Sequence, residues 1–214
     1  MGSEQFPDHR YFPGGHNGEP LKRPNWPDPE PRRGQNPLAD DVSRLNAEEV
    51  AGVFCVRTVD DVKAVLARAR EEGKSVSCRG TRHSMGGQSI APGGFVIDLM
   101  LLNSFSFNEE TKTVTTQPGA TWADLIKYLN QWGYSPRTMQ SYSTFSVGGS
   151  LAVNAHGITT DHCGAESVIR FTLVKGTAQR SYANAAPLEN PANFSAWLLA
   201  ATACSGSWLK SPSR

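Results

Sequence analysis

The feature that most constrains the fold is a glycine-rich stretch that lies between two short apolar runs. It reads Ser-Cys-Arg-Gly-Thr-Arg-His-Ser-Met-Gly-Gly-Gln over residues 77–88, and it leads through Pro92 and two glycines into a second apolar run at 95–99. Glycine lets the backbone turn without a Cβ in the way, so that N–H groups can come close to an anion. The pattern predicts two strands joined by a loop that binds a diphosphate.

Helix and strand signals on both sides place this loop in a folded domain. A short strand precedes Thr58, which caps an expected helix that ends at Gly73. Residues 104–116 are typical of a β-hairpin, and a second capped helix is expected between Thr121 and Gly133. The order of strand, helix, strand, strand, hairpin and helix predicts the α+β class with a mixed sheet.

A second informative stretch covers residues 143–157, and small side chains dominate its middle. Such a run indicates that something flat, or another backbone, lies against it. A flavin ring or a dinucleotide satisfies that requirement. The apolar residues 168–174 are expected to form the strand that follows.

Together the two stretches resemble the FAD-binding domain of the vanillyl-alcohol oxidase superfamily, which includes cytokinin dehydrogenases, aldonolactone and alditol oxidases and decaprenylphosphoryl-ribose oxidase. The resemblance rests on Arg-Gly-x-x-His-Ser-x-x-Gly-Gln-x-x-Ala-Pro-Gly-Gly from Arg79, Ser-Val-Gly-Gly from Ser146 and Asn-x-His-Gly from Asn154. It extends over about residues 42–195. It implies a two-subdomain FAD-binding (PCMH-type) fold of the α+β class, with mixed β-sheets and flanking helices.

The resemblance also implies that FAD is the cofactor, with the first loop around its diphosphate and the second along the ribityl chain and ring. The residues expected to bind FAD are Arg79, Gly80, Thr81, Arg82, His83, Ser84, Met85, Gly87, Gln88, Ser146, Gly148, Gly149, Asn154, His156, Gly157, Gly164 and Ile169.

Several of these side chains have alternative interpretations. Many relatives with a histidine at the position of His83 bond it covalently to the flavin 8α carbon, and a neutral imidazole nitrogen is the nucleophile that this bond needs. Covalent attachment through His83 is therefore expected, the alternative being a histidine that only makes hydrogen bonds within the loop. His156 is expected to be structural or to touch FAD. Arg79 and Arg82 are expected to neutralise the diphosphate, the alternative being two solvated side chains.

By the same resemblance the activity is that of an FAD-dependent oxidoreductase, an oxidase or a dehydrogenase. A substrate C–H bond next to oxygen or nitrogen gives a hydride to flavin N5, and the reduced flavin passes electrons to oxygen or another acceptor. Relatives need a second, substrate-binding domain, which usually carries the catalytic base, and residues 176–214 are too few to form it. No catalytic residue or particular small-molecule substrate is therefore assigned. The alternative function is a flavin-binding fragment without turnover.

Composition argues against several other classes of protein. With 21 basic and 20 acidic residues the net charge is +1, so neither nucleic acid nor an acidic membrane surface is an implied partner. There is no signal sequence and no run near the roughly 18 apolar residues of a membrane span. The four cysteines form no CxxC pair, and two of them lie in strands expected to be buried. They indicate free thiols and a cytoplasmic location. The five histidines lack ligand spacing, so no metal site is expected.

The two ends of the chain depart from the domain pattern. Residues 1–45 hold eight of the fourteen prolines and are expected to form an extended arm or a disordered leader, ahead of an FAD-binding domain at 46–195. No strand is recognisable in residues 196–214. When residues 199–211 are back-translated and read from the third base of each codon, permitted codons give GGYGLFGVLAEVT, which resembles the family's glycine-rich turn and strand. The tail is therefore expected to be aberrant and frame-shifted.

Overall fold

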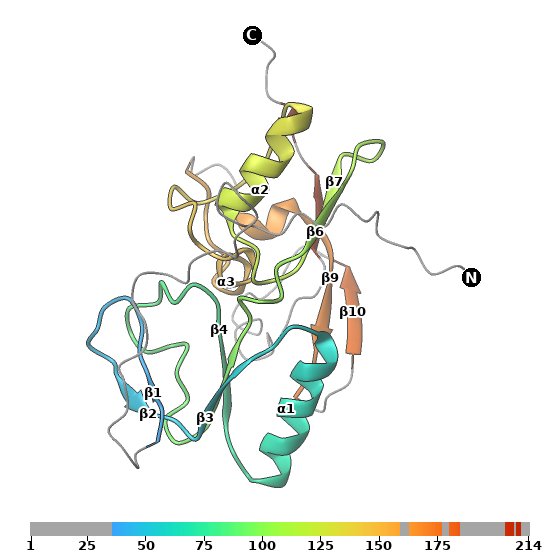
Figure 1. Cartoon of the computed structure of the whole chain (residues 1–214). Coiled ribbons are helices and arrows are strands. Elements are labelled where there is room, and N and C mark those ends of the chain that lie inside the picture. Colours follow the sequence, from blue (N-terminus) through green and yellow to red (C-terminus); the bar gives the residue numbers. More distant parts are fainter. Residues whose placement is uncertain (1–35, 159–162, 177–179, 185–203, 208, 211–214) are drawn as a thin grey trace.

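The strands of the protein fall into two main sheets, one parallel and one antiparallel, each with its own helix (Figure 1). The computed structural model describes residues 36–158, 163–176, 180–184, 204–207 and 209–210. The predicted α+β class with flanking helices is confirmed. Parallel and antiparallel strands lie in different sheets, however, and not in a single mixed one.

The parallel sheet has the order β3-β5-β4, and α1 connects its two outer strands. Its elements are β3 (Gly52–Cys55), α1 (Val59–Glu71), β4 (Val76–Arg79) and β5 (Phe95–Asp98). Thr58 accepts a hydrogen bond from the backbone N–H of Asp61, and the Asp61 carboxylate accepts one from the N–H of Thr58. This reciprocal capping box and the left-handed Gly73 (φ +62°) confirm the predicted helix.

The register of the parallel sheet determines where the glycine-rich loop begins. Arg79 is opposite Asp98, so β4 and β5 end at the same edge of the sheet. Because the strands are parallel, residues 80–94 have to run from this edge back to the opposite edge before β5 can start. The loop therefore leaves the sheet at its carboxyl edge, where open α/β sheets commonly bind ligands.

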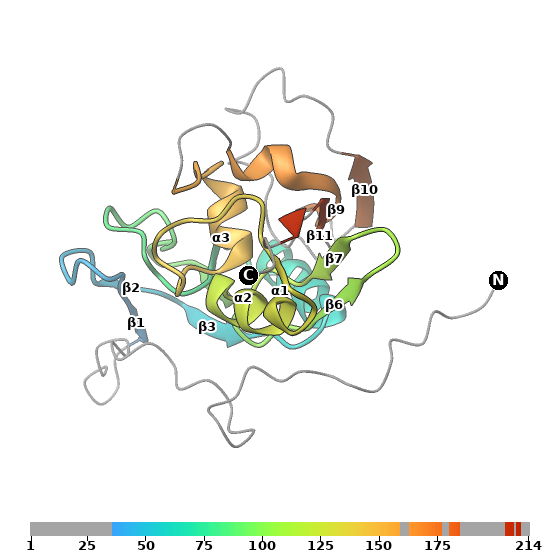
Figure 2. The same ribbon diagram turned by 90° about the horizontal axis from the view of Figure 1, so that it is seen from above.

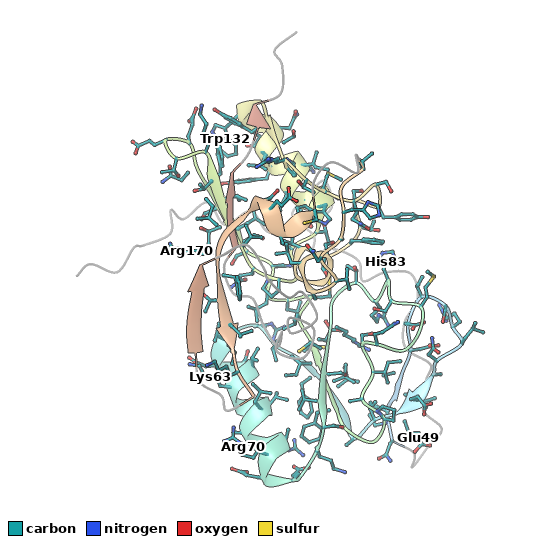
Figure 3. The ribbon with its side chains drawn as sticks, turned by 180° about the vertical axis from the view of Figure 1, so that it is seen from behind. Glu49, Lys63, Arg70, His83, Trp132 and Arg170 are labelled. Atoms are coloured by element: carbon teal, nitrogen blue, oxygen red, sulfur yellow. The ribbon has the colours of Figure 1, made fainter. Side chains whose placement is uncertain are left out.

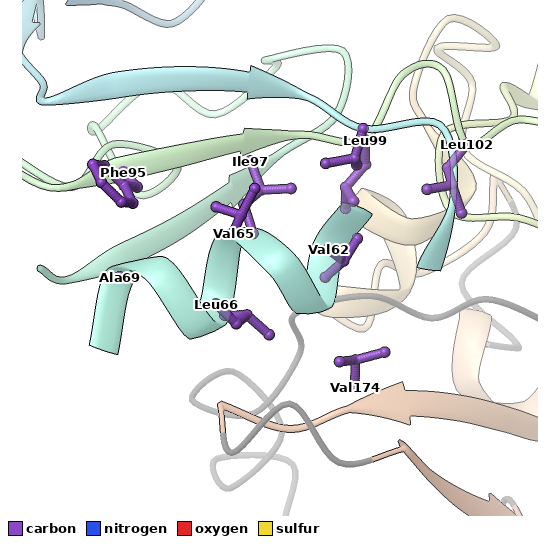
Figure 4. Packing of buried hydrophobic residues seen from close by; sticks show 10 residues of the cluster. Val62, Val65, Leu66, Ala69, Phe95, Ile97, Leu99, Leu102 and Val174 are labelled. Carbon is purple, nitrogen blue, oxygen red and sulfur yellow. The ribbon is translucent and has the colours of Figure 1, made fainter. Parts of the chain in front are cut away.

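The first hydrophobic core forms between α1 and the parallel sheet (Figure 4). Val62, Val65, Leu66 and Ala69 recur at helical spacing on one face of α1, and all four are buried. They pack with apolar side chains of β5 and of the segment after it, and with Val174 from the other sheet. The main partners are Phe95, Ile97, Leu99 and Leu102.

The antiparallel sheet has the order β10-β9-β11-β7-β6. Its strands are β6 (Phe105–Asn108), β7 (Thr113–Thr116), β9 (Val168–Val174), β10 (Arg180–Asn184) and β11 (Cys204–Ser207). β6 and β7 pair as the predicted hairpin, and β9 is the predicted strand. β11 lies between β7 and β9 and pairs with both, so the prediction that the tail has no strand is wrong for these residues.

The second core lies between this sheet and α2 (Trp122–Leu129). Trp122, Leu125 and Leu129 pack with Phe105 and Val114. Thr121 caps the helix and a left-handed Gly133 follows it, as predicted, although its last turn is a 3₁₀ helix over Asn130–Trp132. Two cores with two sheets are the basis of the two-subdomain description.

Smaller elements complete the described chain. They are β1 (Leu38–Ala39) paired with β2 (Glu48–Glu49), β8 (Tyr134–Ser135) paired with β12 (Leu209–Lys210), the short helix α3 (Val147–Ala152) and a 3₁₀ turn at Gly164–Ser167. The β1–β2 ribbon and β10 lie on opposite sides of the molecule in two perpendicular views (Figures 1 and 2). Within the described ranges, none of the helices has the length and apolar character that crossing a bilayer requires.

The described chain differs from the sequence expectations at two further points. Ala39 and Asp41 are almost fully buried, so the folded body starts before the expected boundary at residue 46. Cys55, expected in a buried strand, is exposed at the end of β3, whereas Cys78 is half-buried. β3 is an edge strand of its sheet. The burial of a side chain on an edge strand depends on neighbouring segments, which the periodicity of the strand does not reveal.

Candidate functional site

The first glycine-rich loop leaves β4 in a conformation that few side chains adopt. Arg82 has φ +61° and Gly87 has φ +71°, both in the left-handed region. Left-handed arginine is uncommon, and such residues persist where surrounding contacts hold them, often at functional sites. Arg82 is 7% exposed, so the loop is fixed against the body of the protein at this residue.

Between these two points lie two backbone donors that the described chain leaves available. Among the described residues, none accepts a hydrogen bond from the N–H groups of Ser84 or Met85. The Met85 side chain is 71% exposed. Exposed backbone donors on a glycine-rich turn are the donor set that a diphosphate needs, so this part of the loop fits the expected guest.

His83 is held against the second motif. Its Nε2 lies 3.1 Å from the Thr144 hydroxyl, and its ring centroid lies 4.3 Å from that of Phe145 and 6.0 Å from that of Tyr142. Tyr142 and Phe145 are themselves stacked at 5.5 Å. Burial lowers the pKa of His83, so the imidazole is neutral at neutral pH. Figure 3 shows His83 on the same side of the molecule as Glu49 and opposite Lys63 and Arg170.

The small residues of the second motif allow a close backbone approach. A Cβ on Gly148 would lie 2.5 Å from Cβ of Pro118 and 2.9 Å from its carbonyl oxygen, and the Gly148 N–H donates to that oxygen. Of the two occupants that the sequence suggests for this run, the structure therefore places another backbone at Gly148. A Cβ on Gly149 would meet only the Ser146 hydroxyl, at 2.9 Å.

The two motifs, more than sixty residues apart in sequence, meet in space. Thr81 accepts a hydrogen bond from the Ser146 backbone N–H at 3.1 Å, and both residues are buried. The Ser146 side chain occupies the space that a Cβ on Gly80 would need. With the contact of His83 to Thr144, this joins the expected diphosphate loop to the expected ribityl segment.

The residues after the second motif form a connected turn. Asn154 has φ +47° and accepts from the Ala165 N–H at 3.3 Å. The Nδ1 atom of His156 lies 2.7 Å from the carbonyl oxygen of Gly157, and the Gly164 N–H donates to Ala155. His156 is therefore held by local backbone contacts. Ile169 is 48% exposed on β9.

Arg79 lies at the end of β4 and is buried. Its Nε lies 3.0 Å from Oδ2 of Asp98, so it forms an ion pair inside the parallel sheet. The alternative of a solvated side chain is therefore wrong, whereas the diphosphate contact stays a prediction. A buried guanidinium requires a partner, and the adjacent strand supplies it.

Other expected residues serve the loop itself. Gln88 accepts from the Gly86 N–H at 3.0 Å, and Gly87 donates to the buried Asp41. Five residues outside the expected site touch the loop or His83, namely Asp41, Asn46, Tyr142, Thr144 and Phe145. Asp-x-Ser at residues 41–43 is a turn signal that would have found the first of these. Thr144 and Phe145 lie in the second stretch, at 143–157, but were not among the residues expected to bind FAD, and Tyr142 directly precedes that stretch.

Comparison with known proteins agrees with this geometry. A family model described as FAD binding domain matches residues 50–179. Cytokinin dehydrogenase 2 from Arabidopsis thaliana is 28% identical over 115 residues, which cover 52% of this chain and 23% of the relative. D-arabinono-1,4-lactone oxidase from Eremothecium gossypii is 30% identical over 132 residues, which cover 59% of this chain and 25% of the relative.

A solved structure is similar at the level of the fold. The chain aligns with 6-hydroxy-D-nicotine oxidase from Arthrobacter nicotinovorans with a TM-score of 0.62 and 20% identity, over 74% of this chain and 36% of that one. The chain thus spans about a quarter of the length of the two curated relatives. The residues that the family model matches, 50–179, contain both motifs.

Proposed function

The chain belongs to the FAD binding domain family, and on that premise we propose that it is the FAD-binding part of an oxidoreductase that oxidises a small molecule at a C–H bond next to oxygen or nitrogen. The cofactor is FAD, and when bound it supplies the hydride acceptor at flavin N5. The observation that carries the proposal is the meeting of the two motifs through Thr81 and Ser146. It supports a single continuous cofactor site.

Each part of the chain has a distinct task in this proposal. The backbone N–H groups of Ser84 and Met85 bind the diphosphate, because no described residue accepts a hydrogen bond from them and their turn is held at both ends. Ser146 connects the two motifs, and Gly148 lets the second motif approach Pro118. The remaining expected residues of the second motif and of the turn after it line the rest of the cofactor.

We further propose that His83 is the residue of covalent attachment. Its lowered pKa keeps the imidazole neutral, and a bond to the flavin 8α carbon requires a nitrogen lone pair. The contact of Nε2 with the Thr144 hydroxyl orients the ring in the loop. Phe145 and Tyr142 restrict the ring from one side.

The test is whether the purified protein is yellow and keeps its colour after acid precipitation. With a covalent bond the pellet retains the flavin, whereas the His83→Ala variant should release it to the supernatant while its circular dichroism spectrum is unchanged. Thr144→Val should slow attachment but leave FAD bound. A wild-type protein whose flavin appears in the acid supernatant would contradict covalent attachment. Failure of the wild type to bind any FAD would contradict the function itself.

The substrate requires a separate experiment. Anaerobic bleaching of the flavin absorbance near 450 nm is measured with a cytokinin, D-arabinono-1,4-lactone and 6-hydroxy-D-nicotine, the compounds that the names of the similar proteins suggest. Bleaching by one of them assigns the substrate class. A flavin that binds and is bleached by dithionite but by none of the three assigns flavin binding without turnover to the 214-residue chain.

We also propose a cytoplasmic location. The support is that the four cysteines of the sequence form no CxxC pair and no ligand cluster, a pattern that favours a reducing compartment. Cell fractionation of a tagged chain checks this proposal, and recovery in a secreted or organellar fraction would contradict it.

A further inference from the structure

A segment upstream of the residues that match the family contacts the first loop. Residues 37–50, which include the β1–β2 ribbon, lie on the same side of the molecule as the loop that follows β4 (Figures 1 and 2). The sequence gives this segment no part in the cofactor site. The structure connects it to the loop at three points.

The first connection is the carboxylate of Asp41, which is 1% exposed. Its Oδ2 accepts from the Gly87 N–H at 2.8 Å and from Nδ2 of Asn46 at 2.9 Å. Its Oδ1 accepts from the N–H of Ser43 at 2.9 Å and from the hydroxyl of the same residue at 2.6 Å. Four donors on one carboxylate compensate for the loss of water around it.

The protonation state of Asp41 agrees with this geometry. Burial acts to raise the pKa of Asp41, but hydrogen bonds from Ser43, Gly87 and Asn46 outweigh it, and the net effect is a lowered pKa. The group is therefore an anion at neutral pH, and all four donors keep a charged acceptor.

The other two connections reach the same loop from the same segment. Asn46 donates from Nδ2 to the carbonyl oxygen of Met85 at 3.0 Å. The Val42 N–H donates to the carbonyl oxygen of Arg82 at 3.0 Å. The contacts at Arg82 and Gly87 fall on the left-handed residues between 80 and 88. Of the two, Arg82 is in a conformation that non-glycine residues adopt rarely and that surrounding contacts have to hold.

The segment is itself anchored. The Val50 N–H donates to the Pro37 carbonyl, and the Gly93 N–H donates to the Glu49 carbonyl. Ala39 and Val50 pack against Val96 of the central strand β5. Hydrogen bonds from this segment therefore attach the loop to the parallel sheet.

We propose that Asp41 is a positioning residue for FAD, and that with Asn46 it holds residues 82–87 in the conformation that presents the N–H groups of Ser84 and Met85 to the diphosphate. The proposal rests on the proposed FAD binding. Asp41 acts through Gly87 and Asn46 and does not touch the cofactor. A free turn would have to be ordered when FAD binds, and a turn already held in place avoids that loss of conformational entropy.

The test compares Asp41→Asn and Asn46→Ala with the wild type, and Asp60→Asn is the matched control, because Asp60 is an exposed helix carboxylate far from the loop in sequence. FAD dissociation constants are measured by quenching of flavin fluorescence, in a His83→Ala background so that a covalent bond cannot mask affinity. We expect the constant to rise about tenfold or more for Asp41→Asn, because the charge-assisted hydrogen bond from the Gly87 N–H is weakened. The rise should be smaller for Asn46→Ala, which removes a neutral hydrogen bond to the Met85 carbonyl. The control should not change.

Hydrogen exchange of the FAD-free protein gives an independent readout. The amides of Gly86 and Gly87, which have acceptors in the folded chain, should exchange faster in both variants, while those of α1 stay protected. Unchanged FAD affinity and unchanged loop exchange in folded variants would overturn the proposal. If Asp41→Asn does not fold, Asn46→Ala decides on the same two measurements. If the wild type binds no FAD, the proposed function fails, and unchanged loop exchange would then separately overturn the role of Asp41.

Discussion

The buried ion pair between Arg79 and Asp98 allows a quantitative test of how the first loop is supported. The two residues end adjacent parallel strands in register, with Nε and Oδ2 3.0 Å apart and side chains 3% and 10% exposed. Oδ1 of Asp98 also accepts from the Met100 N–H at 3.0 Å. Removal of either charge leaves the other one buried without its partner, immediately before the loop begins.

The expected magnitude follows from that burial. Breaking a buried pair by removing one partner costs about 3–5 kcal/mol, whereas an exposed pair is worth about 0–1 kcal/mol. Asp98→Asn and Arg79→Met change volume little, so cavity formation contributes little to either value. We expect each single variant to lose about 3–5 kcal/mol, a large part of the roughly 5–15 kcal/mol that stabilises a domain. The double variant should lose less than the sum, by about 1–3 kcal/mol.

The assay is urea unfolding followed by circular dichroism, with the slope checked for each variant so that differences report stability alone. Asp60→Asn, which removes the exposed pair with Lys63, is the control and should stay within about 1 kcal/mol of the wild type. Single variants that lose less than 1 kcal/mol, or a double variant that equals the sum, would refute the reasoning. If Arg79→Met instead keeps its stability and loses FAD affinity, the arginine contacts the diphosphate as the sequence suggested.

Two further predictions concern a glycine and the cysteines. Gly148→Ala should lower the free energy of unfolding by about 1–3 kcal/mol, because its Cβ would collide with the backbone and ring of Pro118. Gly149→Ala should lower it less, since the Cβ at that position meets a hydroxyl. Equal melting temperatures for the two variants would contradict the contact. Burial raises the pKa of the Cys78 thiol to about 12, so at pH 8 a disulfide reagent should modify the exposed Cys55 rapidly and Cys78 only on unfolding. The Cys55→Ser variant should therefore have one rapidly reacting thiol fewer than the wild type. Loss of a rapidly reacting thiol in Cys78→Ser would refute this order of reactivity.

Local elements followed from the sequence because their signals are local. The box formed by Thr58 and Asp61, the apolar period of α1 and the left-handed Gly73 together specify one helix without reference to the rest of the chain. The hairpin at 105–116 is equally self-contained. The two motifs were also identified from their residues, since glycine and small side chains mark close approach whatever the partner is.

Partners distant in sequence were decided by the tertiary structure. Arg79 faces Asp98 because the return of residues 80–94 makes β4 and β5 parallel and in register, and nothing near Arg79 in the sequence indicates which strand will be its neighbour. The same holds for Thr144, which meets His83 across 61 positions of the sequence.

The limit is clearest at the start of the domain. The sequence by itself determined that residues 80–88 form a glycine-rich turn suited to an anion, because backbone freedom is a property of the residues in the turn. It did not determine which residues hold that turn. The proline-rich composition of residues 1–45 predicts an extended or disordered segment, and it gives no indication that the Asp41 carboxylate is buried. Only the folded chain brings Asp41 to Gly87 and Val42 to Arg82, since hydrogen bonds to left-handed residues depend on where two distant segments pass each other.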